Sequence, residues 1–345
     1  MTVSEIRHGE TDNVEFKLME PDEDKKFLKT VAAFSNCGGG TVVFGVKNGT
    51  REIIGIQEDS IFTVMDGIAD SISDNISPQI IPSITFQTIN NKTIVVVQVY
   101  PGQNTPYYLK SEGVINGTYI RVGATTRKAE NEKVQEFILR GTHQSYDELF
   151  QHTEPADRKD IDMLCSVIEK YNGEQDKSVT VENLVSWKLL KTEGGGFIPS
   201  IAFRLLAHND LHFAQIQCAL FKGTDRADFL DRKEFNGPLY EQIENAYTFV
   251  LQHINRGARI NGLVREDIYE LPVAAIRELI VNAIMHRNYL EHSCIQVSVF
   301  DDRIEILSPG GLYGGLTKKE MLSGRSSIRN RLIRAEGLIP RPFGS

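Results

Sequence analysis

The sequence predicts an α+β protein made of more than one domain. Residues 23–36 and 272–289 place apolar side chains at helical spacing, which indicates two long amphipathic helices. Short β-rich segments follow each helix, and those after the first are joined by Asn-Gly and Asn-Asn turns. A chain of 345 residues exceeds the usual size of one domain and predicts two or three.

Residues 1–142 are predicted to form the first α+β domain. The helix over 23–36 ends at the triple glycine 38–40. The strands TVVFGV and EIIGI flank Asn48-Gly49, and SITFQTI and KTIVVVQVY flank Asn90-Asn91, so we expect two hairpins. A further strand, YIRV, precedes a closing helix, NEKVQEFILRG.

The remaining residues are predicted to form two further regions. Residues 143–265 begin as a polar linker and continue as a mixed α/β region. Residues 266–345 open with the second long helix, which has Pro272 near its start, and continue with the strands IQVSVF and RIEIL and the loop SPGGLYGG. We expect this last region to be a separate domain.

The composition is that of an ordinary globular protein, with 41% hydrophobic residues and a mean hydropathy of -0.25. No segment approaches the ~20 apolar residues of a membrane helix, and the N-terminus lacks the apolar core of a secretion signal. Cys37, Cys165, Cys218 and Cys294 lie far apart and form no zinc motif. They are typical of thiols in a reducing compartment, so we expect a cytoplasmic protein with no membrane partner.

The net charge of -8 excludes a uniformly basic surface for nucleic acid but not a local one. Residues 119–128 contain Arg121, Arg127 and Lys128 and no acid, and residues 317–341 contain seven Lys or Arg against two Glu. Two interpretations stay open for these stretches. They contact phosphate, or they are solvated faces of the protein.

Glu10, Glu15 and Lys17 form the first set of side chains that could perform chemistry. Two carboxylates and a lysine can hold a divalent metal and stabilise the charge that develops on a phosphate, as metal-dependent nucleases require. Glu15 and Lys17 share a face if they lie on a strand. An exposed, charged strand edge is the alternative, and it is the more common origin of such a pattern.

The second long helix places Glu278, Asn282, His286 and Tyr289 on one stripe, opposite its aliphatic side chains. A Glu and an Asn one turn apart can activate water and bind Mg²⁺ beside a triphosphate. Gly310-Gly311 follows the next strands and would let backbone N–H groups approach a phosphate. The alternative is the solvent face of an amphipathic helix.

Taken together, these motifs resemble a known family of bacterial proteins. Residues 9–142 resemble the Schlafen-type, AlbA-like domain through E-x4-EFK, AFSNCGGGTVVFGV, IIGI and YIRVGATT. Residues 220–335 resemble the C-terminal part of RecG-like transcription regulators through FKGTDRADFLDRKEFNGPLYEQIENA, RELIVNAIMHRNY and DDRIEILSPGGLYGGLTKKEMLSGRSSIRNRLI. RELIVNAIMH is also similar to the N-box of GHKL-type ATPases.

The resemblance implies a Schlafen/AlbA-like DNA-binding domain over 1–142 and a truncated, GHKL-like α/β sandwich over 266–345. It makes the basic residues of 119–128 candidate phosphate contacts. It maps Glu278 to the general base and Asn282 to the Mg²⁺ ligand of an ATPase. The other candidates for this cofactor site are His286, Gly310 and Gly311.

The sequence departs from both families at positions that matter for catalysis. Schlafen-type nucleases usually carry a third acid after the strand that corresponds to TVVFGV, where this chain has Lys47-Asn48. GHKL-type ATPases open their first glycine box with Asp, where this chain has Ser308-Pro309, and it ends at Ser345 before a second box. We therefore expect little or no nuclease activity, weak binding of Mg²⁺ and ATP at best, and no measurable ATP turnover.

From residues and resemblance together we expect a DNA-binding transcriptional regulator, more a binding protein than an enzyme. Its C-terminal domain would be a degenerate nucleotide-binding or oligomerisation module, and its partners DNA and further copies of itself. The alternative is a metal-dependent nuclease of RNA or DNA in phage defence, with Glu10 and Glu15 as metal ligands and Lys17 beside them. In a third interpretation both sites are vestigial and the protein is an assembly scaffold.

Overall fold

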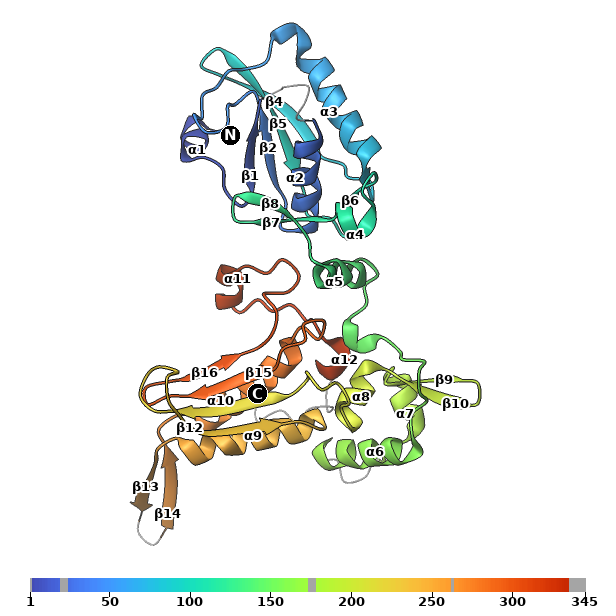
Figure 1. Cartoon of the computed structure of the whole chain (residues 1–345), viewed down its shortest axis with the longest axis vertical. Coiled ribbons are helices and arrows are strands. Elements are labelled where there is room, and N and C mark those ends of the chain that lie inside the picture. The colour runs from blue at the N-terminus through green and yellow to red at the C-terminus, as the bar shows by residue number, and fades with distance from the viewer. Residues whose placement is uncertain (1, 19–23, 173–177, 262–263, 335–345) are drawn as a thin grey trace. The chain divides into compact units, whose positions relative to one another are not determined.

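The computed structural model describes residues 2–18, 24–172, 178–261 and 264–334 (Figure 1). The chain forms two compact units, Met1–His143 and Gln144–Ser345, called unit 1 and unit 2 below. Both units contain helices and a sheet with parallel and antiparallel pairs, which confirms the α+β class. Within the described ranges, no helix is long and apolar enough to cross a membrane.

Unit 1 is built on a four-stranded sheet with the order β1-β2-β5-β4. β1 runs parallel to β2, and the other neighbours are antiparallel. Asn90 and Asn91 have positive φ and join β4 to β5, which confirms the Asn-Asn hairpin. The strands are β1 Val14–Lys17, β2 Gly40–Phe44, β4 Ser83–Ile89 and β5 Lys92–Val99.

The two faces of this sheet have different covers because strand side chains alternate. Val42 and Val97 pack in one cluster with the apolar side chains of α2 and α3. Val43 and Val96 pack in the other with Ile6 of α1. These helices are α1 Val3–His8, α2 Asp24–Asn36 and α3 Ile61–Asn75.

The hairpin expected at Asn48-Gly49 is wrong in its strand pairing. β2 pairs with β1 on one side and with β5 on the other, so neither of its edges is open to the EIIGI segment. The two sides of the turn are linked beyond β2, by a bridge between Val46 and Ile53 and by backbone hydrogen bonds such as that from Lys47 N–H to the Glu52 carbonyl at 2.9 Å. Gly49 still has the positive φ that such a turn needs.

Smaller elements complete unit 1. The hairpin of β7 and β8 contacts α2, and the hydroxyls of Thr30 and Thr126 lie 3.1 Å apart. Asn36, at the end of α2, donates to the carbonyls of Tyr107 and Tyr119 at 2.7 and 3.0 Å. The bounds are β3 Ile76–Ser77, β6 Tyr108–Leu109, β7 Tyr119–Val122, β8 Thr125–Lys128, α4 Gly113–Gly117, α5 Asn131–Gly141 and a 3-10 turn, η2, at Glu58–Ser60.

Unit 2 contains a second four-stranded sheet, with the order β12-β11-β15-β16. β11 and β15 are parallel, so strands from the middle and from the C-terminal part of the chain lie side by side. α9 and α10 contact this sheet and each other. The bounds are β11 Ile216–Phe221, β12 Phe229–Phe235, β15 Ile295–Val299, β16 Ile304–Leu307, α9 Leu239–His253 and α10 Val273–His286.

The other elements of unit 2 are short. A turn in the Glu-Gly-Gly-Gly segment 193–196 joins β9 to β10, with positive φ at Gly194 and Gly195. A second two-stranded hairpin, β13–β14, follows α9. The bounds are η3 Tyr146–Glu148, α6 Arg158–Asn172, α7 Val181–Ser186, β9 Leu190–Glu193, β10 Gly196–Pro199, α8 Ile201–Ala207, β13 Arg256–Asn261, β14 Val264–Tyr269, α11 Lys318–Leu322 and α12 Arg331–Arg334.

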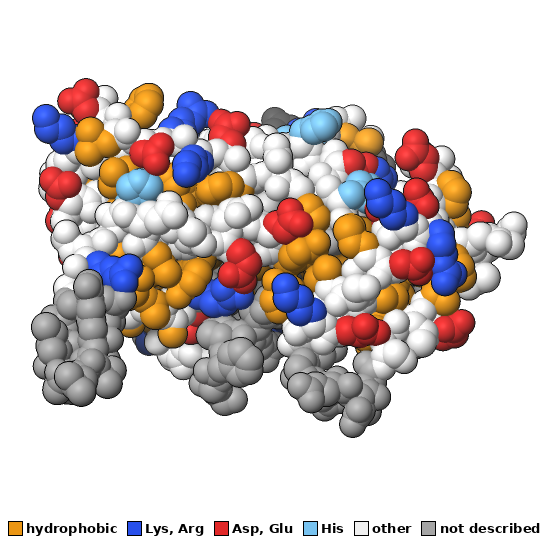
Figure 2. Space-filling model, turned by 90° about the horizontal axis from the view of Figure 1, so that it is seen from below, with side chains coloured by type: hydrophobic (Ala, Val, Ile, Leu, Met, Phe, Trp, Pro, Cys, Tyr) orange, Lys and Arg blue, Asp and Glu red, His pale blue; other side chains and the backbone are white. Residues whose placement is uncertain are grey.

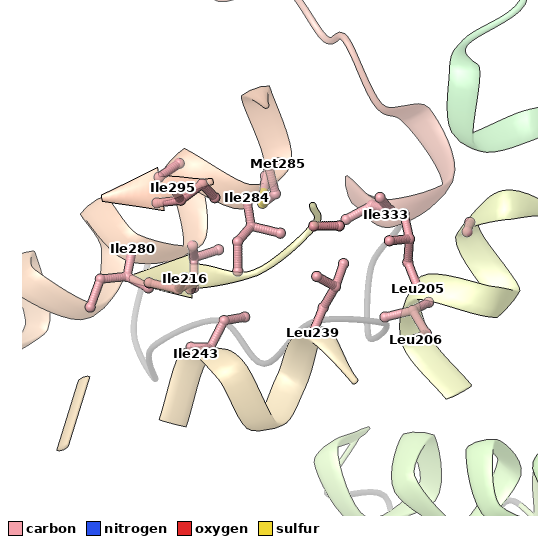
Figure 3. Close-up of a cluster of buried hydrophobic side chains, with 14 of the residues drawn as sticks. Leu205, Leu206, Ile216, Leu239, Ile243, Ile280, Ile284, Met285, Ile295 and Ile333 are labelled. Carbon is pink, nitrogen blue, oxygen red and sulfur yellow. The ribbon is translucent and has the colours of Figure 1, made fainter. Parts of the chain in front are cut away.

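One hydrophobic core joins the described residues of unit 2. It extends along the sequence from Ile161 to Ile333 and joins the middle of the chain to its C-terminal part. Figure 3 shows Leu206, Ile243, Ile284 and Ile333 converging from α8, α9, α10 and α12. The last short helix is therefore held by packing as well as by its own hydrogen bonds.

α10 ends earlier than the sequence predicts. Arg287 adopts extended backbone, so the helix stops at His286. Tyr289 lies beyond it, is 1% exposed and donates its hydroxyl to the carbonyl of Ile284. The expectation that Tyr289 shares the exposed stripe of the helix is therefore wrong. Leu279, expected on the buried side, is 56% exposed.

Charged side chains of both signs are mixed on the surface. Figure 2 shows Lys and Arg beside Asp and Glu, with hydrophobic side chains between them, over the described residues of one face. The described surface carries exposed ion pairs, such as Arg303 with Asp302 and Glu305, and Lys191 with Glu193. Exposed pairs of this kind contribute little to stability.

Candidate functional site

Glu15 and Lys17 lie on one face of β1, as their spacing predicts. The Glu15 carboxylate contacts Lys17 Nζ at 2.8 Å and Arg121 Nη1 at 2.8 Å. Glu15 is 8% exposed. Its charge is therefore balanced inside the protein by two cations, and a metal ion would have to displace one of them.

Arg121 is held inside unit 1. Besides Glu15, its guanidinium donates to the Thr126 hydroxyl at 2.9 Å and to the carbonyls of Thr11 and Asp12 at 2.8 and 3.2 Å. Its side chain is 4% exposed. The expectation that Arg121 contacts phosphate is contrary to this geometry, because four of its five N–H donors are used within the fold.

Glu10 and the neighbouring loops complete the picture of this set. The Glu10 carboxylate accepts a hydrogen bond from the backbone N–H of Phe16 at 2.9 Å, which brings it beside β1. Lys47, which stands where Schlafen-type nucleases usually carry a third acid, is exposed. Among the described residues, no group of three or more His, Cys, Asp or Glu could hold a metal ion.

Arg127 and Lys128 lie exposed on β8. Arg127 is paired with Ile120 and so lies on the opposite side of the hairpin from Arg121, which is paired with Thr126. Lys128 Nζ donates to Asn116 Oδ1 at 2.6 Å. Of the three predicted phosphate contacts, these two are accessible.

The five residues predicted to form a cofactor site line one pocket in unit 2. Glu278, Asn282 and His286 extend along α10, and Gly310 and Gly311 belong to the loop after β16. The pocket has a volume of about 870 Å³, within the usual range for small-molecule sites. The rest of its lining is Ser308, Leu312, Tyr313, Leu316, Met321, Gly324, Arg325, Ser326 and Ser327.

The pocket places three different polar groups in a row. Glu278 is exposed, whereas Asn282 and His286 are partly buried. Burial, together with the positive charges of Arg334 and Arg329, lowers the pKa of His286. Its imidazole is therefore neutral at neutral pH, and one ring nitrogen can accept a hydrogen bond while the other donates.

Position 310 requires glycine because two side chains approach its backbone closely. It has a φ of +99°, and a Cβ atom there would lie 2.3 Å from Arg329 Nη1 and 2.6 Å from Asn288 Cβ. Arg329 donates to the carbonyls of His286 and Gly311 at 3.0 and 2.9 Å. The missing side chain thus makes room for a guanidinium that ties the end of α10 to the glycine loop.

The basic stretch 317–341 contains Arg329, which neither of its two sequence interpretations, phosphate contact or solvated face, places inside the protein. Arg329 is instead 6% exposed, and Asn330 is fully buried and donates to the carbonyls of Met285 and Arg287. Sequence reasoning missed both as residues that hold the pocket together. The only signal was the Arg-Asn-Arg run itself, which we interpreted through its charge.

Asn282 and Glu278 are the residues of this pocket that could hold a Mg²⁺-bound nucleotide, since they offer amide and carboxylate oxygens. Ser308, in the place of the missing Asp, donates its hydroxyl to the carbonyl of Ala283 at 2.7 Å. That bond keeps its proton away from a ligand. Nucleotide binding here stays a prediction.

Comparison with known families confirms both resemblances inferred from the sequence. Residues 10–130 match the family described as "Schlafen, AlbA_2". Residues 292–335 match the family described as "Putative ATP-dependent DNA helicase recG C-terminal". The second match includes Gly310 and Gly311 but begins after α10. No curated protein matches the chain significantly.

Two solved structures are similar to parts or most of the chain. The DIP2311 protein from Corynebacterium diphtheriae is 20% identical, with a TM-score of 0.44, over 95% of this chain and 68% of that one. The N-terminal domain of a putative ATP-dependent DNA helicase RecG-related protein from Nitrosomonas europaea is 23% identical, with a TM-score of 0.29. That similarity covers 37% of this chain and 90% of that domain.

Proposed function

We propose that this chain is a DNA-binding transcriptional regulator whose unit 2 binds a nucleotide weakly and does not hydrolyse it. The observation that carries the nucleotide-binding part of this proposal is the pocket that gathers Glu278, Asn282, His286, Gly310 and Gly311. These residues come from segments more than 20 positions apart in the sequence, yet they line one hollow. Their convergence favours a ligand site over the solvent face of a helix.

DNA binding is supported by the two family matches and by the accessible cations of β8. One matched family is named for a DNA helicase. Arg127 and Lys128 are exposed on a hairpin whose described residues between 119 and 128 include no acid. Phosphate contacts from such residues supply affinity without reading sequence.

Weak binding without turnover follows from how the pocket residues are used. Ser308 is bonded within the protein and is a poor replacement for an Asp that accepts from adenine. Glu278 is exposed, so it acts in water rather than in the dry, preorganised field that catalysis of phosphate transfer needs. Asn282 and the neutral His286 still offer hydrogen bonds to a nucleotide.

A nuclease function is disfavoured by the ion pairs of Glu15. Its carboxylate is already bound to Lys17 and Arg121, and Glu10 accepts from a backbone amide.

We also propose a cytoplasmic location, which is supported by four cysteines that form no disulfide. Self-association belongs to the same proposal and is developed below.

DNA binding is tested by a gel-shift titration at several salt concentrations. The double variant Arg127→Ala/Lys128→Ala should bind more weakly on every sequence, and the slope of log affinity against log salt should fall by about 1.8, or ~0.9 for each phosphate that is no longer neutralised. The control is Lys159→Ala/Lys233→Ala, which removes two exposed charges from unit 2. Equal affinity and slope in the wild type and the β8 variant would remove this hairpin from the interface.

Nucleotide binding is tested by calorimetric titration with ATP and Mg²⁺ beside a phosphate-release assay. We expect weak binding that Asn282→Ala abolishes, and no phosphate release above that of Glu278→Ala. Tight binding with turnover that Glu278→Ala abolishes would instead make the protein an ATPase.

A further inference from the structure

Large hydrophobic side chains are exposed along one edge of the sheet in unit 1. Ile81 is 82% exposed just before β4, Phe86 is 46% exposed within it, and Phe62 of α3 is 68% exposed. The rings of Phe62 and Phe86 meet edge to face, with centroids 5.9 Å apart. Exposed apolar side chains that gather on a surface usually mark an interaction site.

The backbone of β4 could also bind a partner along this edge. β4 pairs with β5 along its whole length, and among the described residues no strand pairs with its other side. Its seven residues, SITFQTI, contain no charge and no proline. An edge strand of this composition is a template for pairing with another strand.

The other edges of the two four-stranded sheets are protected by charge. β1 carries Glu15 and Lys17, and β16 carries Glu305. β12 carries four charged residues in the run DRKE. Charged side chains are the usual means by which an edge resists pairing. Among these four edges, β4 alone lacks them.

We propose that β4 pairs antiparallel with β4 of a second copy of this chain, about a two-fold axis near Phe86. Phe86 is the middle residue of β4, so the axis brings the Phe86 rings of both copies together. Ile84 and Phe86 lie on the sheet face that α3 covers, so the exposed Phe62 of each copy joins the same contact.

A second copy fits this edge better than an unrelated partner does. An uncharged strand meets its own copy without like-charge repulsion, and it offers no charge by which a different partner could be selected. A two-fold pairing also covers the β4 edge in both copies and then stops, since β4 is the one uncharged edge of the two four-stranded sheets among the described residues. Two four-stranded sheets become one continuous sheet of eight strands.

This inference rests on the self-association in the proposed function and is independent of DNA and nucleotide binding. It is tested by light scattering coupled to size exclusion over a concentration series of the full chain. We expect wild type to have twice the 38.8 kDa mass of the chain. Phe86→Lys and Ile81→Lys should each return it to the mass of one chain. Ile115→Lys, which charges a residue 61% exposed on α4, should leave the dimer intact.

Ile81→Lys guards against a variant that simply misfolds, because its side chain is almost entirely in solvent. Circular dichroism of each variant should match wild type. A wild type that stays monomeric at every concentration overturns the inference, as does a dimer that survives both substitutions at the edge. Loss of DNA binding in the β8 variant, with the dimer unchanged, would concern only the proposed function.

Discussion

Replacing Arg121 with alanine should destabilise unit 1 strongly. The guanidinium donates to the Glu15 carboxylate, the Thr126 hydroxyl and the carbonyls of Thr11 and Asp12, and its side chain is 4% exposed. The substitution therefore leaves a buried carboxylate with only one of its two cations. This uncompensated charge, rather than the removal of a surface charge, determines the size of the effect.

The magnitude follows from the geometry of Glu15. Breaking a buried ion pair by removing one partner costs about 3–5 kcal/mol. Lys17 remains 2.8 Å from the carboxylate and offsets part of that cost. The two carbonyls belong to partly or fully exposed residues, so water can replace the guanidinium as their donor. We therefore expect about 3 kcal/mol, the lower end of the range.

The measurement is urea denaturation of the full chain, followed by circular dichroism. Arg127→Ala removes a charge of the same kind from the exposed side of the same hairpin and should change the free energy of unfolding by no more than about 0.5 kcal/mol. Glu15→Gln/Arg121→Met removes both charges and should recover part of the stability that Arg121→Ala removes.

If Arg121→Ala unfolds at the same urea concentration as Arg127→Ala, the buried pair does not stabilise the fold and our interpretation of Arg121 fails. A double variant less stable than Arg121→Ala would show that packing of the guanidinium stem, and not the charge of Glu15, carries the effect. A gel shift with Arg121→Ala reports on DNA binding only if circular dichroism shows that the variant is folded without urea.

Three further outcomes are expected. Gly310→Ala, with its new Cβ 2.3 Å from Arg329 Nη1 and a φ of +99°, should lose about 1–3 kcal/mol in urea, whereas Gly311→Ala should not. Burial raises the pKa of Asp147, so its stabilising contribution is complete below the ordinary value of 3.8 and is lost as pH rises through the raised pKa. In thermal melts between pH 3.8 and the raised pKa, the free energy of unfolding of wild type should fall relative to that of Asp147→Asn. The fall should be at most about 1.4 kcal/mol for each pH unit. Finally, RNA and DNA incubated with Mg²⁺ or Mn²⁺ should remain uncut; cleavage that Glu15→Gln abolishes would make the protein a nuclease.

The candidate site in unit 2 was predictable from local patterns. Helical periodicity placed Glu278, Asn282 and His286 on one line, because residues four apart lie on one side of a helix. A glycine pair after a strand predicted a loop whose backbone can approach a ligand. Both inferences depend on short-range geometry, and the structure brings the two segments to one pocket.

The sequence by itself determined the α+β class, the long helices, the Asn-Asn hairpin and five of the fourteen residues that line the pocket, because periodicity and turn chemistry are local. Only the tertiary structure decided that β2 pairs with β1 and β5 rather than with its neighbour EIIGI. It also decided that Arg121 and Arg329 are buried. A charged residue looks the same in the sequence whether it lies at the surface or in the interior. Packing chooses its partners, and for Arg121 the charged partner Glu15 lies 106 residues away.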